Sequence, residues 1–424
     1  MTGIHSNPII IFPCLLGILA CSPPNPARDG GPPAMSVSEV EIPLEPVGTV
    51  PAIDPAVQQQ LEAIGYTASA HPAPPQAHVT IYDPTRAWNG LNLYASWHAP
   101  EDILMDMKGQ VLHTWRYAFE DVWPPPASRA EIDHPDFWRR VRLLGNGHLL
   151  ALYEGYGLIR VDAASRLVWA YPGKCHHDLE VTEEGTVYVL TREAKLLPRV
   201  HPSEPVLEDG LAVLDWNGRE LAKYSILECF ENSNYAPMLR NLPKREGDIF
   251  HTNTIRVFDG SLEHRSPLFK KGNLLISILH TDTIAILDLE KRSVVWALSG
   301  MWDAQHDPSL LPNGRMLILD NLGHGGRSRV LEFDPFTQVV EWMYVGEPDK
   351  PFFTQGCGTC ARLPNGNTLI TETDFGRAFE VAPDKTIVWE FINPHRTGPG
   401  QDQIAKIAEM IRLDRSLPLD WIPE

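Results

Sequence analysis

Basic residues are scarce in this 424-residue chain: 36 Lys and Arg stand against 54 Asp and Glu, which gives a formal net charge of −18. Because the chain contains no block of Lys or Arg, nucleic acid and anionic membrane surfaces are poor partners. Cysteine is also rare, with six residues, and no Cys-x-x-Cys-His sequence occurs. That absence excludes covalent haem attachment. Beyond the N-terminal region, no segment is apolar enough to span a membrane.

The N-terminal residues have the character of an export signal. Residues 9–20 form an apolar run that matches a signal-peptide core and is too short to span a bilayer alone. The run ends at Leu19-Ala20-Cys21, which resembles a bacterial lipoprotein box, although residues 1–8 contain no Lys or Arg. We expect a signal peptide over 1–21, an acylated Cys21 and a periplasmic protein attached to the membrane by its lipid alone. A plain cleaved signal is the alternative.

Residues 22–78 are rich in Pro, Ala and Glu and show no apolar periodicity. Such a composition cannot bury a core, so we expect an extended tether between the lipid anchor and the folded domain. The first folded strand is expected near Val79.

From Val79 onward, short runs of Val, Ile, Leu and aromatic residues alternate with turn sequences such as Asn-Gly, which favour tight hairpins. An aromatic residue on an apolar run recurs six times, at intervals of 46 to 72 residues. The six residues are Trp115, Trp169, Tyr224, Trp296, Trp342 and Trp389. Because a four-stranded propeller blade takes ~40–50 residues, the repeats predict six blades, and the longest interval predicts an insertion.

The predicted fold is all-β: a six-bladed β-propeller of four-stranded blades over residues 79–397. A unit of this size cannot bury its own apolar face and must stack on its neighbours. Two stacked sandwiches are the alternative, but they would not explain an aromatic marker that recurs in phase. Residues 401–413 have the pattern of an amphipathic helix, so residues 398–424 are expected to form a C-terminal helical tail.

Polar residues that suit catalysis follow the aromatic runs. The segments expected to form innermost strands begin at His134, Cys175, His251, Gln305 and Cys357. Inner strands of a propeller border its central channel, so His177, His251 and His306 are expected to face one another. His177 and His306 both precede a turn glycine by eight residues and are therefore in phase. A lone histidine at a strand end is ordinarily a satisfied polar residue, whereas three in phase suggest a nucleophile, an acid–base group or metal ligands.

Five runs of the chain carry a family likeness. They are Cys175-His-His-Asp-Leu-Glu, Phe250-His-Thr-Asn-Thr-Ile, Gln305-His-Asp-Pro-Ser-Leu-Leu-Pro-Asn-Gly314, Ser328-Arg-Val-Leu-Glu-Phe and Leu363-Pro-Asn-Gly-Asn-Thr-Leu-Ile370. Together they resemble the bacterial arylsulfotransferase family, over about Val79 to Pro394. The resemblance implies a six-bladed propeller that transfers a sulfuryl group between phenolic esters and phenols through a sulfated histidine, with no nucleotide donor or other cofactor.

The resemblance also assigns residues. By order along the chain, it implies that His306 is the nucleophile and that His177 and His251 are the other two channel histidines. Asn253 matches a site asparagine of the family. A neutral imidazole can attack sulfur because a phenol, with a pKa of about 10, is a tolerable leaving group. Small aryl sulfates and phenols would be the partners, and the oligomeric state stays open.

One family residue is missing. The family carries an arginine on the strand after the second histidine, and Leu279 stands at that position here. His280 and Arg256 are the candidate substitutes, although imidazole lacks the bidentate fork of arginine. Two other functions therefore stay open: a non-catalytic ligand-binding propeller, and a metal-dependent enzyme or metal carrier that uses the channel histidines and cysteines.

Four cysteines belong to the predicted folded region: Cys175, Cys229, Cys357 and Cys360. In an exported protein the ordinary expectation is a disulfide, and the short loop between Cys357 and Cys360 would strain one, which leaves Cys175 or Cys229 as a partner. Reduced Cys175, Cys357 and Cys360 with a histidine could instead bind a soft metal such as Cu(I) or Zn(II). Unpaired core thiols are the third reading.

Overall fold

The computed structural model describes residues 71–123, 137–242 and 247–422. The chain divides into two units, residues 1–49 and 50–424, and the first lies outside the described residues. So do the expected signal peptide, Cys21, most of the expected tether, and His134. Within the described residues, no helix is long and apolar enough to cross a membrane.

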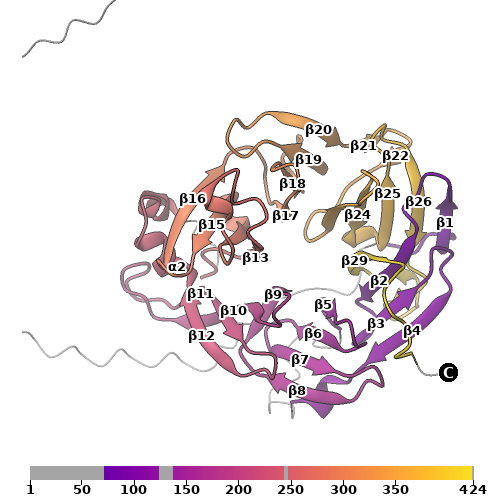
Figure 1. Ribbon diagram of the computed structural model, residues 1–424, viewed down its shortest axis with the longest axis horizontal. Coiled ribbons are helices and arrows are strands. Elements are labelled where there is room, and N and C mark those ends of the chain that lie inside the picture. The colour runs from indigo at the N-terminus through magenta and orange to yellow at the C-terminus, as the bar shows by residue number, and fades with distance from the viewer. Residues whose placement is uncertain (1–70, 124–136, 243–246, 423–424) are drawn as a thin grey trace, which may run out of the picture. The chain divides into compact units, whose positions relative to one another are not determined.

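Six antiparallel sheets, each with four blade strands, surround one axis (Figure 1), which confirms the predicted six-bladed propeller. The first three, from innermost to outermost strand, are β29 (Ile407–Asp414), β2 (Gly90–Ser96), β3 (Glu101–Met105) and β4 (Val111–Arg116); β5 (Arg140–Leu143), β6 (Leu149–Tyr153), β7 (Gly157–Val161) and β8 (Leu167–Tyr171); and β9 (Cys175–Val181), β10 (Val187–Lys195), β11 (Val206–Leu214) and β12 (Glu220–Ser225).

The other three sheets complete the ring. They are β13 (Thr252–Val257), β14 (Leu274–Ile278), β15 (Thr283–Asp288) and β16 (Ser293–Ser299); β17 (His306–Leu310), β18 (Met316–Asp320), β19 (Arg329–Phe333) and β20 (Val340–Tyr344); and β23 (Thr359–Arg362), β24 (Thr368–Glu372), β25 (Arg377–Val381) and β26 (Ile387–Ile392), with β1 (His78–Tyr82) as a fifth, outer strand. We number the blades one to six in the order given.

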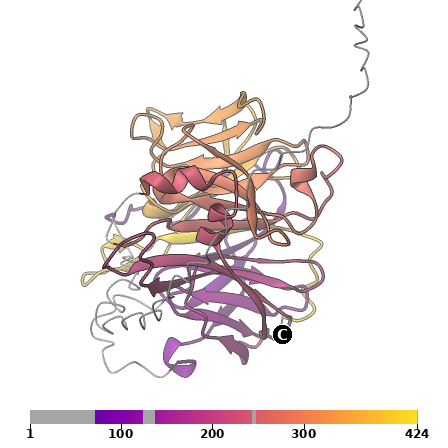
Figure 2. The same ribbon diagram turned by 90° about the vertical axis from the view of Figure 1, so that its left-hand side faces the viewer.

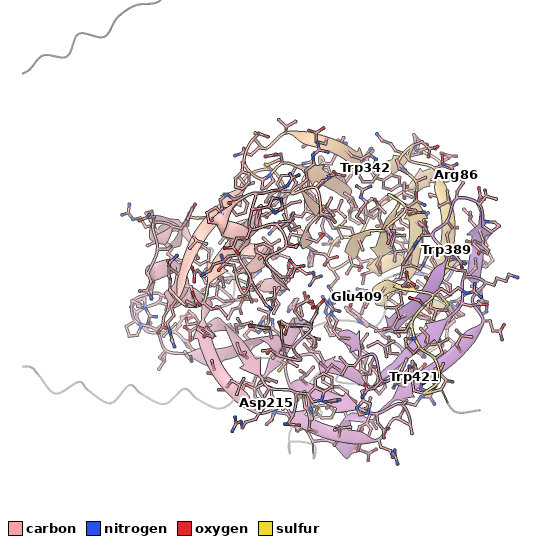
Figure 3. All side chains as sticks on the ribbon, viewed as in Figure 1. Arg86, Asp215, Trp342, Trp389, Glu409 and Trp421 are labelled. Atoms are coloured by element: carbon pink, nitrogen blue, oxygen red, sulfur yellow. The ribbon has the colours of Figure 1, made fainter. Side chains whose placement is uncertain are left out.

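The recurring aromatic residues lie on the outermost strands, where they fasten each blade to the next. Trp115, Trp169, Trp342 and Trp389 each donate an indole N–H to a backbone carbonyl in the following blade, at 2.9 to 3.2 Å. Trp342 and Trp389 are labelled on the outer part of the ring in Figure 3. Tyr224 instead stacks under the guanidinium of Arg292, 5.0 Å from its ring centre. The repeat thus marks a contact between blades, which explains why it recurs in phase.

The apolar core consists of six clusters, each shared by two neighbouring blades. Strand β6 shows how one strand serves two clusters: Leu149, Ala151 and Tyr153 pack toward blade one, whereas Leu150 and Leu152 pack toward blade three. Alternate residues of a strand point to opposite faces, so every blade is buried on both sides. Truncating one such leucine to alanine costs about 2–5 kcal/mol, and a blade has no core without its neighbours.

The expected C-terminal helix is wrong. Residues 407–414 form β29, the innermost strand of blade one, paired with β2 from Gly90–Asp414 to Ser96–Ile407. Ile404, Ile407, Ala408 and Ile411 happen to fit helical spacing, but blade one has no other inner strand, and its backbone groups need one. The strand therefore closes the ring, and the propeller runs from His78 to Asp414 instead of ending at 397.

Several short elements decorate the ring. Residues 71–73, expected to belong to the tether, bond to 402–404 beside the pair β27 (Arg396–Thr397) and β28 (Gln403–Ile404). The longest repeat contains α2 (Ile226–Glu231) and the 3₁₀ helix η3 (Ala236–Asn241), which confirms the expected insertion; Figure 2 shows α2 on the outside of its blade. The remaining elements are η1 (Phe119–Asp121), η4 (Pro267–Phe269), η5 (Leu279–Thr281), η6 (Thr373–Phe375), β21 (Gly346–Glu347) and β22 (Lys350–Pro351).

Candidate active site

The chain is bent near the start of four inner strands: β9, β13, β17 and β23. The backbone angle φ is 57° at His177, 54° at His251, 53° at Asp307 and 60° at Cys357. Such left-handed conformations are uncommon for residues with a side chain and concentrate at functional sites. The structure places the ring of His177 4.7 Å from that of His251, and the ring of His251 5.0 Å from that of His280.

His306 is fixed by hydrogen bonds at both ring nitrogens. Its Nδ1–H donates to the side-chain oxygen of Asn321 at 2.9 Å and lies 3.1 Å from the carbonyl of Ala304. Because both partners are acceptors, the proton must sit on Nδ1. Nε2 keeps its lone pair and accepts the backbone N–H of Cys357 at 3.2 Å. The amide of Asn321 is itself held by the carbonyls of Thr354 and Cys357.

His177 belongs to a buried group with His176 and Glu154. The backbone N–H of His177 donates to Glu154 at 2.9 Å, and its Nδ1 lies 3.1 Å from the other oxygen of that carboxylate and 2.9 Å from His176 Nδ1. His176 Nε2 faces the carbonyl of Thr191 at 3.2 Å, so it carries the proton of that ring. His176 Nδ1 is then an acceptor, and His177 carries its proton on Nδ1.

His251 has a charged partner. Its Nδ1 lies 2.6 Å from a carboxylate oxygen of Asp248, and its backbone N–H donates to the other oxygen at 3.0 Å. His280, in η5, places Nδ1 2.9 Å from the backbone carbonyl of Asp248. His251 and His280 are therefore protonated on Nδ1, as are His177 and His306, and Nε2 is the basic nitrogen of all four rings.

Burial keeps His176, His177 and His306 uncharged. Burial lowers the pKa of His306 to about 3, and the charge of Arg139 acts in the same direction. The pKa of His177 is held well below its ordinary value by burial, then by His251 and Arg139. That of His176 is lowered by burial and by His177. At neutral pH these rings are neutral, which is the state a nucleophilic nitrogen requires.

The hydrogen bonds of the Asn253 side chain to other described residues go to Gln305 and Thr254, neither of them a histidine. Its amide N–H donates to the carbonyl of Gln305 at 2.9 Å, and its oxygen accepts the hydroxyl of Thr254 at 3.0 Å. The residue is fully buried. In this structure Asn253 braces the strand that carries His306.

Arg139 is a site residue that sequence reasoning missed. It is fully buried just before β5, and its guanidinium donates to the thiol sulfur of Cys357 at 3.2 Å. The backbone N–H of the same Cys357 donates to Nε2 of His306, so Cys357 contacts both the Arg139 guanidinium and that nitrogen. Arg139 precedes the turn residue Gly147 by eight positions, the same phase as His177 and His306, so the spacing could have found it.

Beneath the histidines, the inner strands carry an ion-pair belt of six charged residues: Glu409, Arg140, Arg142, Asp178, Arg256 and Asp307. They come from blades one to five in turn, and the backbone N–H of Cys360 in blade six bonds Asp307 at 2.8 Å. Figure 3 labels Glu409 on the inner side of its blade. Arg256, one of the candidate substitutes for the missing arginine, is thus occupied by Asp178 at 2.6 Å and by Asp307.

The belt carboxyls show how many cations a buried acid needs. Burial raises the pKa of Asp178, but Arg256, Arg140 and Arg142 outweigh it and hold that pKa below its ordinary value. Asp307 has Arg256 as its close ion pair, and there burial prevails and raises the pKa. Opposite charges thus pair from one inner strand to the next around the axis.

The four described cysteines are free, buried thiols, so the expected disulfide is wrong. Among the described residues, three groups could hold a metal ion: His98, Glu101 and His395; Glu154, His176 and His177; and Asp248, His251 and His280. None of these three contains a cysteine, so the structure does not assemble Cys175, Cys357 and Cys360 into a ligand set. In the second and third groups, the Nδ1 atoms are already used by the internal hydrogen bonds described above.

Comparisons with known proteins identify a family. The family model described as arylsulfotransferase (ASST) matches residues 140–394. No curated protein matches the chain. Among solved structures, a protein of unknown function from Bacteroides caccae is 12% identical, with a TM-score of 0.49, covering 76% of this chain and 98% of that one. Virginiamycin B lyase from Staphylococcus aureus is 9% identical, with a TM-score of 0.36, covering 60% and 69%. These structural likenesses carry no argument about activity.

Proposed function

The chain belongs to the arylsulfotransferase family, and on that premise we propose that it transfers a sulfuryl group from an aryl sulfate to a phenol through a sulfated His306. The observation that carries the proposal is the state of His306. It is a buried, neutral imidazole with its proton fixed on Nδ1 and a lone pair on Nε2. No nucleotide donor enters the reaction.

In the first half-reaction, Nε2 of His306 attacks sulfur, the N–S bond forms, and the S–O bond to the aryl oxygen breaks. The N–H of Cys357 gives up its bond to Nε2 as the nitrogen attacks, and it then points at the sulfuryl oxygens. Arg139 supplies a cation beside that N–H. Arg139 thus fills the role of the missing family arginine, for which the sequence offered only His280 and Arg256. Arg256 is already paired with Asp178 and Asp307 in the belt. In the second half-reaction an acceptor phenol attacks sulfur and restores His306.

Steady-state kinetics of the purified protein with an aryl sulfate donor and a phenol acceptor test the proposal. We expect parallel lines for donor and acceptor, as in a double-displacement reaction, and a loss of at least ~10³-fold in rate for His306→Ala. His264→Ala, which removes an exposed histidine, is the matched control and should retain the wild-type rate. Absence of turnover by the wild type with every aryl sulfate offered would contradict the proposal.

We also propose that the chain is exported to the periplasm and anchored by a lipid on Cys21. The supporting observation is the apolar run before Leu19-Ala20-Cys21. Labelled fatty acid should be incorporated into the wild type and not into Cys21→Ser. Equal labelling of both proteins would contradict the anchor.

A further inference from the structure

Asp248 organises two imidazoles of the site at once. Both of its carboxylate oxygens bind His251. One accepts the ring Nδ1–H at 2.6 Å and the other accepts the backbone N–H at 3.0 Å. Its backbone carbonyl accepts from His280 Nδ1 at 2.9 Å. The residue lies in the segment before β13, outside every run that carries the family likeness.

The surroundings of Asp248 keep it negatively charged. Arg192, from β10, donates to the same oxygen that holds the ring of His251, at 3.2 Å. Burial would raise the pKa of Asp248, but the hydrogen bond and charge of His251 and the charge of Arg192 hold it well below the ordinary value. The neighbouring Asp209, from β11, is fully buried, and burial followed by the charge of Asp248 raises its pKa to about 6. Of the two acids, Asp248 is therefore the stronger, and it stays ionised where Asp209 begins to take up a proton.

The difference from His306 is the key observation. The Nδ1–H of His306 points at the neutral amide oxygen of Asn321, whereas that of His251 points at a carboxylate. A carboxylate stabilises an imidazolium on the ring it faces, and an amide does so far less. His251 is also the more accessible ring, with 20% of its side chain exposed, against 2% exposure for the residue His306.

We infer that Asp248 is the positioning residue that makes His251 the acid–base group of the transfer; the inference rests on the proposed function. In the first half-reaction, the proton on Nε2 of the His251 imidazolium passes to the departing aryl oxygen as the S–O bond breaks. In the second, the acceptor phenol returns a proton to the same nitrogen as its oxygen bonds sulfur and the N–S bond breaks. The cycle gains and loses no proton, and Asp248 balances the charge of the imidazolium throughout.

The inference makes a prediction about acceptors. A weakly acidic phenol needs a base to become a nucleophile, whereas a nitrophenol is largely ionised at neutral pH and does not. Loss of Asp248 should therefore slow transfer to the first far more than transfer to the second. A purely structural role for Asp248 would slow both acceptors equally.

The test compares wild type, Asp248→Asn and the control Asp288→Asn with phenol and with a nitrophenol as acceptors. Asp288, from β15 of the same blade, is a buried carboxylate that pairs with Lys270 and Lys291, away from the histidines. We expect Asp248→Asn to lower kcat/KM for phenol by about 10²-fold and kcat/KM for the nitrophenol by less than tenfold. In a double-displacement reaction, kcat/KM for the acceptor reports the second half-reaction alone. The control should match the wild type with both acceptors.

A double-mutant cycle guards against a folding defect. If Asp248 acts through His251, adding Asp248→Asn to His251→Gln should cause no further loss, because the partner is already gone. Equal slowing of both acceptors, or full additivity in the cycle, would overturn the inference while wild-type transfer and the proposed function stand. Failure of the wild type to transfer sulfuryl groups at all would overturn the proposed function itself.

Discussion

Two levels of the central channel are built from neighbouring residues and follow opposite rules. In two blades the chain reads His-Asp: His177 and His306 enter the site, and Asp178 and Asp307 enter the ion-pair belt. The belt keeps its charges and pairs them with arginines. The site keeps His176, His177 and His306 neutral and pairs them with hydrogen-bond partners. In the belt, buried charges are matched by opposite charges and stabilise the fold. In the site, burial keeps an imidazole neutral and leaves a reactive lone pair on its nitrogen.

The belt should carry stability, so Asp178→Asn is expected to cause the largest change in unfolding free energy. The substitution leaves Arg256, Arg140 and Arg142 facing Glu409 and Asp307 alone, and breaking a buried pair costs about 3–5 kcal/mol. Urea unfolding measures the loss, with Asp349→Asn, an exposed acid, as the control. A loss below ~1 kcal/mol would show that the belt is not a stabilising layer.

The neutral site should make the protein acid-sensitive. In the folded protein the pKa values of His176, His177 and His306 are lowered. Below pH ~6.5 the unfolded chain therefore binds more protons at these residues than the folded chain does. The free energy of unfolding consequently falls as pH falls. Asp209, with its pKa raised to about 6, opposes this partly. His177→Gln should reduce the slope of unfolding free energy against pH by about 1.4 kcal/mol per unit below pH 6. An unchanged slope in urea unfolding at pH 4.5 to 6 would contradict a neutral His177.

Asn321→Asp would give His306 the kind of partner that His251 has. The pKa of His306, about 3 in the wild type, should rise because an adjacent carboxylate favours the imidazolium by one to three units. Because the variant also loses the two amide hydrogen bonds to Thr354 and Cys357, the readout is the ratio of its rate to that of the wild type. We expect this ratio to be about tenfold lower at pH 5 than at pH 8. Rate profiles for the two proteins over pH 5 to 8 measure the effect. Superimposable profiles would mean that the amide of Asn321 does not set the state of His306.

Much of the fold could be predicted because its signal is repeated. Six aromatic residues in phase indicate six blades, and four of them donate an indole hydrogen bond to the next blade. The closing strand could not be identified in this way, because residues 404–411 fit a helix and a strand equally well and only the unpaired edge of blade one decides. Local pattern holds little information about a partner more than 300 residues away.

The site was predictable where it follows the repeat and hidden where it does not. His177 and His306 share a spacing to a turn glycine, and the same spacing points to Arg139. The predicted start of that inner strand, His134, does not have this spacing. Asp248 and Glu154 lie at the ends of segments and do not share the spacing to a turn glycine that marks His177 and His306. Their roles depend on which side chains they meet across blades, and sequence spacing does not record that.

The most direct test of the account is to look for the sulfated histidine. Wild-type protein quenched during turnover with an aryl sulfate, then digested and examined by mass spectrometry, should yield a peptide that carries one sulfuryl group on His306. The adduct should disappear when a phenol acceptor is added before the quench, and His306→Ala should never show it. A sulfuryl group on another residue, or turnover without any covalent adduct, would contradict the mechanism.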